Sequence, residues 1–249
     1  MTLKSIFRDI LFYLSVPYCI SCGERLDRHD VAFCPKCSLE FREIASRNCS
    51  VCNNILVHCS CSCDYLESLR VKRVVKVFRY NNRPENMTAN RLIYSLKGDD
   101  RFDVTEYASD VLCEAIRNSF DTFDNVVITN VPRRKRAIVK FGYDHAARLA
   151  RATARKLGAE YADLLRSRAR APQKAKREQE RRINAKFCIK RRMDLTGKTV
   201  IIVDDVITTG SSVGACATLL RQMKPREIAA ASLAIAYKDK YVPPLILPF

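Results

Sequence analysis

The stretch that most constrains the fold is Val200 to Ser212, which reads V-I-I-V-D-D-V-I-T-T-G-S-S. Its four leading β-branched residues predict a short buried strand over 200–203, and apolar residues at helical spacing predict a helix over 213–223. A loop between a buried strand and a helix N-terminus presents free backbone N–H groups and the positive end of the helix dipole. The stretch therefore predicts a strand, an anion-binding loop and a helix, in that order.

The side chains of this stretch point to two kinds of ligand group. The loop offers four hydroxyls and a glycine that allows close backbone approach, namely Thr208, Thr209, Gly210, Ser211 and Ser212. The preceding carboxylates, Asp204 and Asp205, accept hydrogen bonds and therefore need sugar hydroxyls or a Mg²⁺ ion carried by a pyrophosphate. A ribose 5-phosphate satisfies both ends. The alternative is a strand end with two solvated acids and an ordinary helix cap.

The rest of the C-terminal part alternates strand-like and helix-like segments. Strands are predicted over 71–80, 126–131 and 227–237, and helices over 102–120 and 144–157. A further short helix is predicted over 5–16. This alternation predicts an α/β fold with a mainly parallel sheet, whose functional loops lie at the carboxyl ends of the strands.

A cluster of cysteines predicts a first metal site near the N-terminus. Nine of the twelve cysteines lie between residues 19 and 63. The first four form two Cys-x-x-Cys pairs, Cys19 with Cys22 and Cys34 with Cys37, a spacing typical of a closed tetrahedral zinc site. The alternative, a disulfide framework, requires an oxidising compartment, and nothing in the sequence points to secretion.

A second zinc site is predicted from the cysteines that follow. Its expected ligands are Cys49, Cys52 and Cys63, with either Cys59 or Cys61 as the fourth. The alternative is that these are spare surface thiols. Closed four-thiolate sites stabilise small folds and leave no open position for catalysis. Residues 1–66 are therefore predicted to form a double zinc ribbon with a leading helix, and residues 67–249 a separate domain.

The charge of the chain is strongly positive and unevenly distributed. The formal net charge is +17, and the segment from Arg133 to Arg192 holds 21 Lys and Arg against 5 Asp and Glu. Such a segment is either a set of solvated helix faces or a surface for polyanions. No stretch approaches the roughly 18 apolar residues of a membrane span, and no signal-peptide cleavage site is evident. These features predict a cytoplasmic protein without membrane insertion.

The 200–212 stretch resembles the phosphoribosyl pyrophosphate (PRPP) binding motif of type I phosphoribosyltransferases. The whole chain resembles the ComF family, which joins a cysteine-rich zinc module to a phosphoribosyltransferase domain. Besides the cysteine pairs, the matching stretches are V-F-R-Y (77–80), Y-S-L-K-G-D-D-R (94–101), F-G-Y-D-H-A-A-R-L-A (141–150), A-P-Q-K (171–174) and E-R-R-I-N (180–184).

The resemblance implies a role for each part of the site. Asp204 and Asp205 would bind the ribose 2- and 3-hydroxyls, and residues 208–212 would hold the 5-phosphate. The pyrophosphate loop would contain Pro132, Arg133 and Arg134. The run from Arg166 to Arg182 would be a mobile lid, whose candidate catalytic or charge-neutralising residues are Lys174, Arg177, Arg181 and Arg182.

The sequence departs from the family pattern at three places. In the second zinc ribbon, Ser60 stands where the family has the Cys-x-x-Cys partner of Cys63, which leaves the fourth ligand open. The sequence also has V-P-R-R-K-R-A where the family more often has V-P-L-H-P-R-R, and G-Y-D-H where the family has G-F-N-Q. His145 thus replaces a Gln, and we interpret it as a solvated or helix-capping residue.

Two functions follow from the resemblance and the charge. The first is a PRPP-binding protein of DNA uptake, which handles single-stranded DNA together with a helicase-like partner. A positively charged groove suits that role, although sparse aromatic residues argue against an extensive stacking platform. The second is an active phosphoribosyltransferase, in which Mg²⁺ accompanies PRPP and Asp204, Asp205, Lys174 and Arg177 serve catalysis. The acceptor cannot be read, because no pocket for a nitrogenous base is recognisable.

Overall fold

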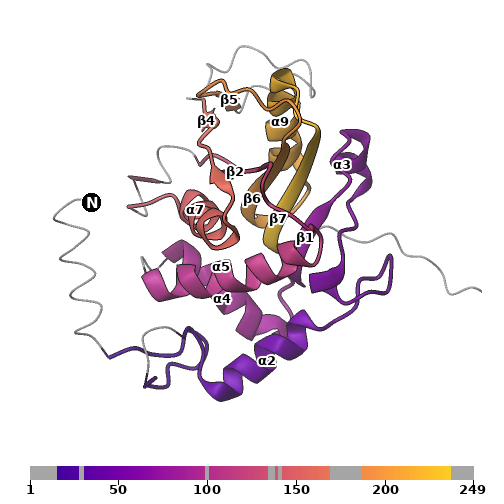
Figure 1. Ribbon diagram of the computed structural model, residues 1–249. Helices are drawn as coiled ribbons and strands as arrows, with labels where there is room; N and C mark the ends of the chain where they lie inside the picture. The colour runs from indigo at the N-terminus through magenta and orange to yellow at the C-terminus, as the bar shows by residue number, and fades with distance from the viewer. Residues whose placement is uncertain are drawn as a thin grey trace, which may run out of the picture.

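A five-stranded parallel sheet forms the centre of the molecule (Figure 1). The computed structural model describes residues 16–27, 31–98, 101–133, 138–139, 142–168 and 187–236. The strand order is β1-β7-β6-β2-β3, and all four neighbouring pairs run parallel. The strands are β1 (Val74–Arg79), β2 (Val126–Asn130), β3 (Glu160–Tyr161), β6 (Thr199–Ile207) and β7 (Glu227–Ile235). The predicted α/β fold with a mainly parallel sheet is confirmed.

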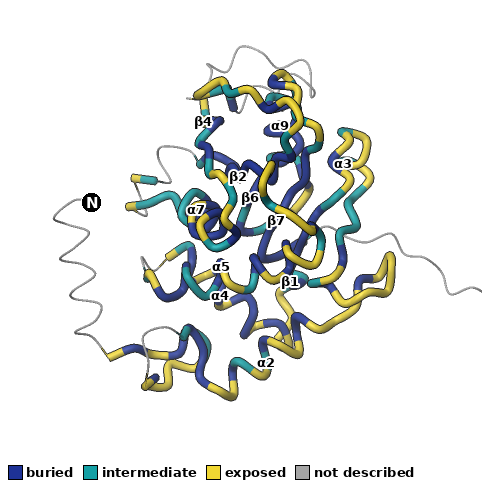
Figure 2. The backbone as a smooth tube through the Cα atoms, viewed as in Figure 1, coloured by how far each residue is buried: buried dark blue, intermediate teal, exposed yellow. Residues whose placement is uncertain are grey.

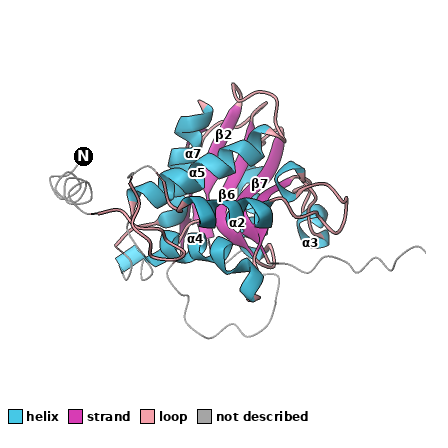
Figure 3. Cartoon of the chain, turned by 90° about the horizontal axis from the view of Figure 1, so that it is seen from below, coloured by secondary structure: helices cyan, strands magenta, loops and turns pink. Residues whose placement is uncertain are grey.

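Helices cover both faces of this sheet. The α-helices are α2 (Pro35–Ala45), α3 (Asp64–Ser68), α4 (Met87–Gly98), α5 (Phe102–Arg117), α7 (His145–Leu157) and α9 (Ser211–Leu220). Short 3-10 helices are η1 (Leu56–His58), η2 (Pro84–Asn86) and η3 (Arg221–Met223). Figure 3 shows the strands between α5 and α7 on one side and α3 on the other. Helix α9 packs on β6 and against α3.

The alternation of side chains along β6 separates two hydrophobic clusters. Ile201 and Val203 belong to the cluster that contains the buried residues of α5 and α7. Val200 and Ile202 belong to the cluster that contains the buried residues of α9. Because successive side chains of a strand point to opposite faces, each face of β6 contributes to a different core. We call these the α7 face and the α9 face.

Local sequence signals explain the bounds of α7. Asp144 precedes the helix, and its side chain accepts a hydrogen bond from the Ala147 N–H at 3.0 Å. Gly158 follows the helix in the left-handed conformation, with φ 68°. An aspartate N-cap and a left-handed glycine after the last turn are the usual start and stop of a helix. Helix α7 therefore matches the predicted range within one residue.

The cysteine-rich segment packs directly on the sheet and its helices. Cys19, Phe33 and Phe41 share a hydrophobic cluster with Phe78 of β1. Leu66 is fully buried in the other cluster, against α9. Figure 2 shows buried stretches both in the cysteine-rich segment and in the sheet. The predicted division at residue 66 stays a prediction, and apolar packing crosses it on both faces.

Several elements differ from the sequence-based expectations. Strand β6 does not end at Val203 but runs through both aspartates to Ile207, because its backbone continues to pair with β7. Helices α2 and α4 were not predicted. The helix expected over 5–16 lies almost wholly outside the described residues. Within the described ranges, no helix combines the length and apolarity that crossing a membrane requires.

Candidate functional site

The hydroxyl-rich loop lies at the carboxyl end of β6 and leads into α9. Thr208 and Thr209 are exposed, and Gly210 is the N-cap of α9 with φ 74°. The Thr209 hydroxyl lies 3.1 Å from that of Ser211 and accepts a hydrogen bond from the Ser211 N–H at 3.3 Å. The first N–H groups of a helix have no partner within the helix. The predicted order of strand, loop and helix is therefore present, with hydroxyls and a helix N-terminus on one loop.

Asp205 is a buried carboxylate that three basic side chains surround. Its Oδ2 atom lies 3.0 Å from Lys97 Nζ, 3.1 Å from Arg133 Nη2 and 3.1 Å from His145 Nε2. Its Oδ1 atom accepts a hydrogen bond from the Val206 N–H at 2.9 Å. The three partners come from separate places in the fold: α4, the segment after β2, and the first residue of α7. With three donors on one oxygen, this carboxylate is already occupied.

The two neighbouring aspartates have opposite electrostatic environments. Burial alone would raise the pKa of Asp205, but the hydrogen bond from His145 and the charges of Lys97 and Arg133 hold that pKa well below its usual range. Burial and the adjacent charge of Asp205 raise the pKa of Asp204 well above its usual range. Asp205 is therefore a permanent anion, and Asp204 is the carboxyl group that can respond to a ligand.

Asp204 faces the other side of the sheet from Asp205. It is half-buried, and its Oδ1 atom accepts a hydrogen bond from the Asp205 N–H at 3.0 Å. Because side chains alternate along β6, Asp204 lies on the α9 face together with Val200 and Ile202. Burial, and to a lesser extent Asp204, raises the pKa of Cys216 in α9. We expected both acids to bind one sugar, but in the structure their side chains point to opposite faces of the sheet.

His145 has a different place from the one we expected. Its side chain is 1% exposed, so it is not solvated, and Asp144 rather than His145 caps α7. Because Asp205 Oδ2 is an acceptor, His145 Nε2 donates the hydrogen bond between them. The Nδ1 atom has no hydrogen-bond partner among the described residues. The tertiary fold, which brings α7 against β6, converts this position into a buried support for Asp205.

The other residues of the predicted pyrophosphate loop and lid are only partly described. Pro132 is buried and Arg133 half-buried, whereas Arg134 lies outside the described residues. Lys174, Arg177, Arg181 and Arg182 also lie outside them. Strands β4 (Leu165–Ser167) and β5 (Phe187–Ile189) pair antiparallel and bracket this segment. The proposed roles of these basic residues stay predictions.

Lys97 is the site residue that sequence reasoning missed. It belongs to the stretch Y-S-L-K-G-D-D-R, which carried part of the family resemblance but had no assigned role. It lies at the end of α4, and its side chain is 37% exposed while its Nζ contacts Asp205. A lysine partly open to solvent and fixed by a buried carboxylate is suited to binding an anion. The only signal for Lys97 in the sequence was its place in this motif, and nothing in the motif indicated that Lys97 would contact Asp205.

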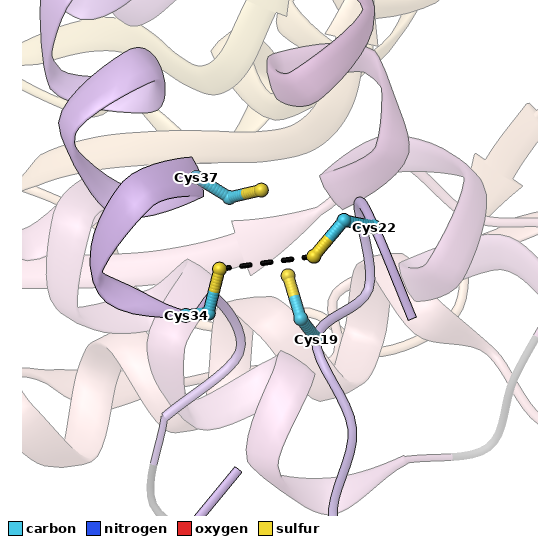
Figure 4. Close-up of side chains that lie close together, drawn as sticks. All are labelled: Cys19, Cys22, Cys34 and Cys37. Atoms are coloured by element: carbon cyan, nitrogen blue, oxygen red, sulfur yellow. Dashed lines mark hydrogen bonds between the residues drawn. The ribbon is translucent and has the colours of Figure 1, made fainter. Parts of the chain in front are cut away.

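The first cysteine cluster has the arrangement that the spacing predicted. The Sγ atoms of Cys19, Cys22, Cys34 and Cys37 all lie within 4.8 Å of one another. Cys22 and Cys34 are separated by 3.7 Å between sulfurs, and the four side chains converge on a common point (Figure 4). All but Cys22 are buried. Four convergent thiol groups form a donor set that fits a structural zinc ion.

The second cysteine cluster has a different ligand set from the one we predicted. It comprises Cys49, Cys52, Cys59 and Cys61, and the sulfurs of Cys52 and Cys59 lie 3.5 Å apart. The expectation that Cys63 is a ligand is not met. Cys63 directly precedes α3, where the chain has left the cluster, and packs against the core on the α9 face. Both Cys59 and Cys61, rather than one of them, complete the group of four.

Comparisons with known proteins bear on the C-terminal part of the chain. Residues 144–246 match the family model described as "Phosphoribosyl transferase domain". This range contains β6, the hydroxyl-rich loop and α9. Together with the parallel sheet, the match supports a phosphoribosyltransferase-type fold that carries a cysteine-rich N-terminal segment. A comparison with curated proteins gives no match.

Several solved structures resemble the chain more distantly. An allosteric regulatory enzyme of purine biosynthesis is 20% identical, with a TM-score of 0.39 over 55% of this chain and 29% of its own. The purine phosphoribosyltransferase of Pyrococcus horikoshii is 23% identical, with a TM-score of 0.33 over 52% of this chain and 71% of its own. The adenine phosphoribosyltransferase of Saccharomyces cerevisiae is 18% identical, with a TM-score of 0.34 over 56% of this chain and 71% of its own. Likenesses at these levels say nothing about activity.

Proposed function

We propose that this protein binds PRPP at the carboxyl end of β6. The observation that carries the proposal is the loop of residues 208–212, which joins exposed hydroxyls to the N-terminus of α9 next to the responsive carboxyl group of Asp204. The loop lies within the range that matches the phosphoribosyl transferase domain family. A 5-phosphate on the loop and a ribose hydroxyl on Asp204 would use both features.

The two aspartates have separate roles in this proposal. Asp204 accepts a hydrogen bond from a ribose hydroxyl, which favours its ionised form. Asp205 does not contact the sugar, because Lys97, Arg133 and His145 already occupy its Oδ2 atom. Instead Asp205 orients Lys97 and Arg133, whose charges then face the pyrophosphate of the ligand. This division replaces the expectation that both acids bind the vicinal hydroxyls.

A magnesium ion would accompany the ligand. The carboxylate chemistry of the site fits such a hard cation, and half-buried Asp204 offers a carboxylate oxygen as a ligand. When bound, Mg²⁺ would neutralise part of the pyrophosphate charge. The protein's own contribution would be to position the ribose and to stabilise the departing negative charge with Lys97 and Arg133.

Calorimetry of Mg-PRPP binding tests the proposal. The wild-type protein is compared with Asp204→Asn and with Asp194→Asn, an exposed aspartate between β5 and β6 that serves as the matched control. We expect Asp204→Asn to weaken binding by at least about thirtyfold, because it removes a charged acceptor from a ligand hydroxyl. The control should bind as the wild type does. Equal binding by wild type and Asp204→Asn would contradict the assigned role.

We further propose that the bound ligand serves a protein of DNA uptake that acts on single-stranded DNA in the cytoplasm with a helicase-like partner. The supporting observation is the excess of 21 Lys and Arg over 5 Asp and Glu between residues 133 and 192. Fluorescence anisotropy with single-stranded DNA over a salt series, with and without Mg-PRPP, tests this role. Micromolar affinity that falls steeply with salt is expected, and absence of DNA binding at low salt contradicts it.

The alternative is an active phosphoribosyltransferase with a nucleobase-type acceptor. In that reaction the acceptor nitrogen forms a bond to C1 of the ribose, and the bond from C1 to the pyrophosphate oxygen breaks. The family match supports the reaction type but not the acceptor. Release of pyrophosphate from labelled PRPP on addition of a purine or pyrimidine, and its loss in Asp204→Asn, would establish this alternative.

A further inference from the structure

Helix α3, from the end of the cysteine-rich segment, packs beneath the hydroxyl-rich loop. A Cβ atom placed on Gly210 would lie 2.8 Å from Leu66 Cγ and 3.1 Å from its Cδ1 atom. Leu66 is fully buried among the apolar side chains of the α9 face, so a shift of its side chain would disturb that core. Gly210 is required both for this contact and for its positive φ of 74°. The backbone of the loop at Gly210 therefore packs directly against the Leu66 side chain.

The next turn of α9 has the same close contact with α3. A Cβ atom on Gly214 would lie 2.6 Å from Leu69 Cδ1 and 2.8 Å from Tyr65 Cε1. Two glycines, one turn apart, thus present bare backbone to two side chains of α3 and to Leu69, the residue that directly follows α3. At the far end of α9, the side chain of Arg221 in η3 donates a hydrogen bond to the Leu69 carbonyl. Contacts at the start and just past the end of α9 fix its position relative to α3.

The segment before α3 is anchored to the second cysteine cluster and to β1. The Ser60 carbonyl accepts a hydrogen bond from the Val74 N–H at 2.9 Å. The Cys61 carbonyl accepts one from Lys76 Nζ at 2.7 Å, and the Val74 carbonyl accepts another from the same atom at 3.2 Å. Lys76 is only 1% exposed, and these described acceptors are neutral carbonyls.

A metal at this cluster would suit the buried lysine. Four thiolates around Zn²⁺ carry a net charge of −2, which would compensate the ammonium group of Lys76 beside Cys61. Only a few residues separate the cluster from α3. A well-ordered cluster therefore restrains the position of Leu66, because the connection between them is short and hydrogen-bonded. Ser62 Oγ donates a hydrogen bond to the Val71 carbonyl at 2.8 Å, which joins the segment before α3 to the segment after it.

We propose that Leu66 is a positioning residue for the phosphate loop, and that the cysteine-rich segment is thereby part of the ligand site rather than an appended module. This inference rests on the proposed function for its effect on binding. Leu66 holds the backbone of Gly210, and Tyr65 and Leu69 hold that of Gly214, so that the N-terminal turn of α9 is preorganised for a phosphate. Preorganised sites bind more tightly because less ordering accompanies binding.

The test compares two conservative substitutions at fully buried leucines. Leu66→Val removes one methylene beneath the loop, and Leu112→Val removes one in α5 on the α7 face, where it does not contact the loop. Both variants keep an apolar core and are prepared as the full-length, zinc-loaded chain. Amide hydrogen exchange of residues 208–214 is measured without ligand, and Mg-PRPP binding is measured by calorimetry. Thermal unfolding verifies that the two variants are comparably folded.

The expected result separates the two leucines. Leu66→Val should raise exchange over residues 208–214 and weaken Mg-PRPP binding, each by about fivefold, whereas Leu112→Val should leave both unchanged. Unchanged exchange in Leu66→Val, or equal changes in both variants, would overturn the inference. If wild-type protein does not bind PRPP, the proposed function fails, and the exchange comparison still decides whether Leu66 positions the loop.

Discussion

The two faces of β6 give two adjacent carboxyl groups opposite electrostatic environments. On the α7 face, Asp205 is buried, ionised and bound by Lys97, Arg133 and His145. On the α9 face, Asp204 is half-buried and its pKa is raised by burial and by the charge of Asp205. One residue of separation in a strand is enough to produce this contrast, because neighbouring side chains enter different cores. A pair of like residues in a motif therefore need not share a function.

The two cysteine clusters also differ in their surroundings. Cys19, Cys34 and Cys37 of the first cluster belong to the core of the α7 face. The second cluster forms a small core of its own beside β1 and α5, and its connection to the α9 face is the hydrogen bond from Lys76 to the Cys61 carbonyl and the short chain that continues into α3. The two sites should therefore differ in what the protein loses when each is removed. The following predictions test the contrast between the faces, beginning with the largest effect.

Zinc removal is expected to have the largest effect. The wild type should contain two zinc ions per chain, because each cluster offers four thiols. Substituting Cys34 and Cys37 with Ser should remove one ion and prevent cooperative folding, since structural zinc contributes apparent binding energies of about 10–16 kcal/mol.

Loss of the second zinc should act on the α9 face instead. Substituting Cys59 and Cys61 with Ser should also remove one ion, but this variant should still fold, and its increase in hydrogen exchange should be concentrated at residues 208–214. Elemental analysis and exchange measurements check both outcomes. Cys188→Ser, outside both clusters, is the control and should retain two zinc ions. Zinc contents that do not differ among these proteins would refute the assignment of ligands.

Asp205→Asn should have the next largest effect, on folding stability. The substitution removes the charge that compensates Lys97 and Arg133, so two buried or half-buried cations lose their partner. We expect the free energy of unfolding to fall by about 3–5 kcal/mol, measured by urea denaturation. Asp194→Asn should change it by less than about 0.5 kcal/mol. A stable Asp205→Asn protein with weakened PRPP binding would instead place Asp205 on the ligand.

Asp204→Asn should have the opposite sign, with a characteristic pH dependence. Because the folded-state pKa of Asp204 is raised, its contribution to stability is fully present below the unfolded pKa of about 3.9 and is lost as the pH rises through the folded pKa. The Asn variant should therefore match the wild type below the unfolded pKa and become progressively more stable than it as the pH rises from there through the folded pKa. The difference amounts to about 1.4 kcal/mol for each unit by which the pKa is raised.

Urea denaturation across this pH range measures that difference. A variant that is less stable than the wild type at pH 7 would show that Asp204 also has a stabilising partner. The comparison with Asp205→Asn then becomes a direct measure of how far the two faces differ.

His145→Gln should have the smallest effect. A glutamine amide can donate to Asp205 Oδ2 as His145 Nε2 does, and it would also remove the buried Nδ1 atom that lacks a described partner. We expect a change in unfolding free energy of less than about 1.5 kcal/mol and PRPP affinity within threefold of the wild type. His145→Leu, which cannot donate, is the contrasting variant and should be clearly less stable. Equal stability of the Gln and Leu variants would show that the hydrogen bond is unimportant.

Much of the fold followed from local patterns. The β-branched run of β6 and the apolar spacing of α9 are short-range features, and each predicted the start of its element to within a few residues. The end of β6 was misjudged, because Asp204 and Asp205 resemble the start of a loop. Backbone pairing with Ser232 and Ala234 of β7 keeps that stretch in the sheet. Such pairing depends on a distant strand and leaves no local signal.

Residue types and spacing by themselves determined the chemistry that this protein can offer: nine cysteines near the N-terminus in two groups, a hydroxyl-rich loop and a pair of acids. Tertiary structure decided how those groups are combined. It selected Cys61 over Cys63, joined Lys97 and His145 to Asp205, and set Leu66 beneath Gly210. The physical reason is that spacing along the chain limits which ligands can meet, whereas burial and long-range packing determine which of them do.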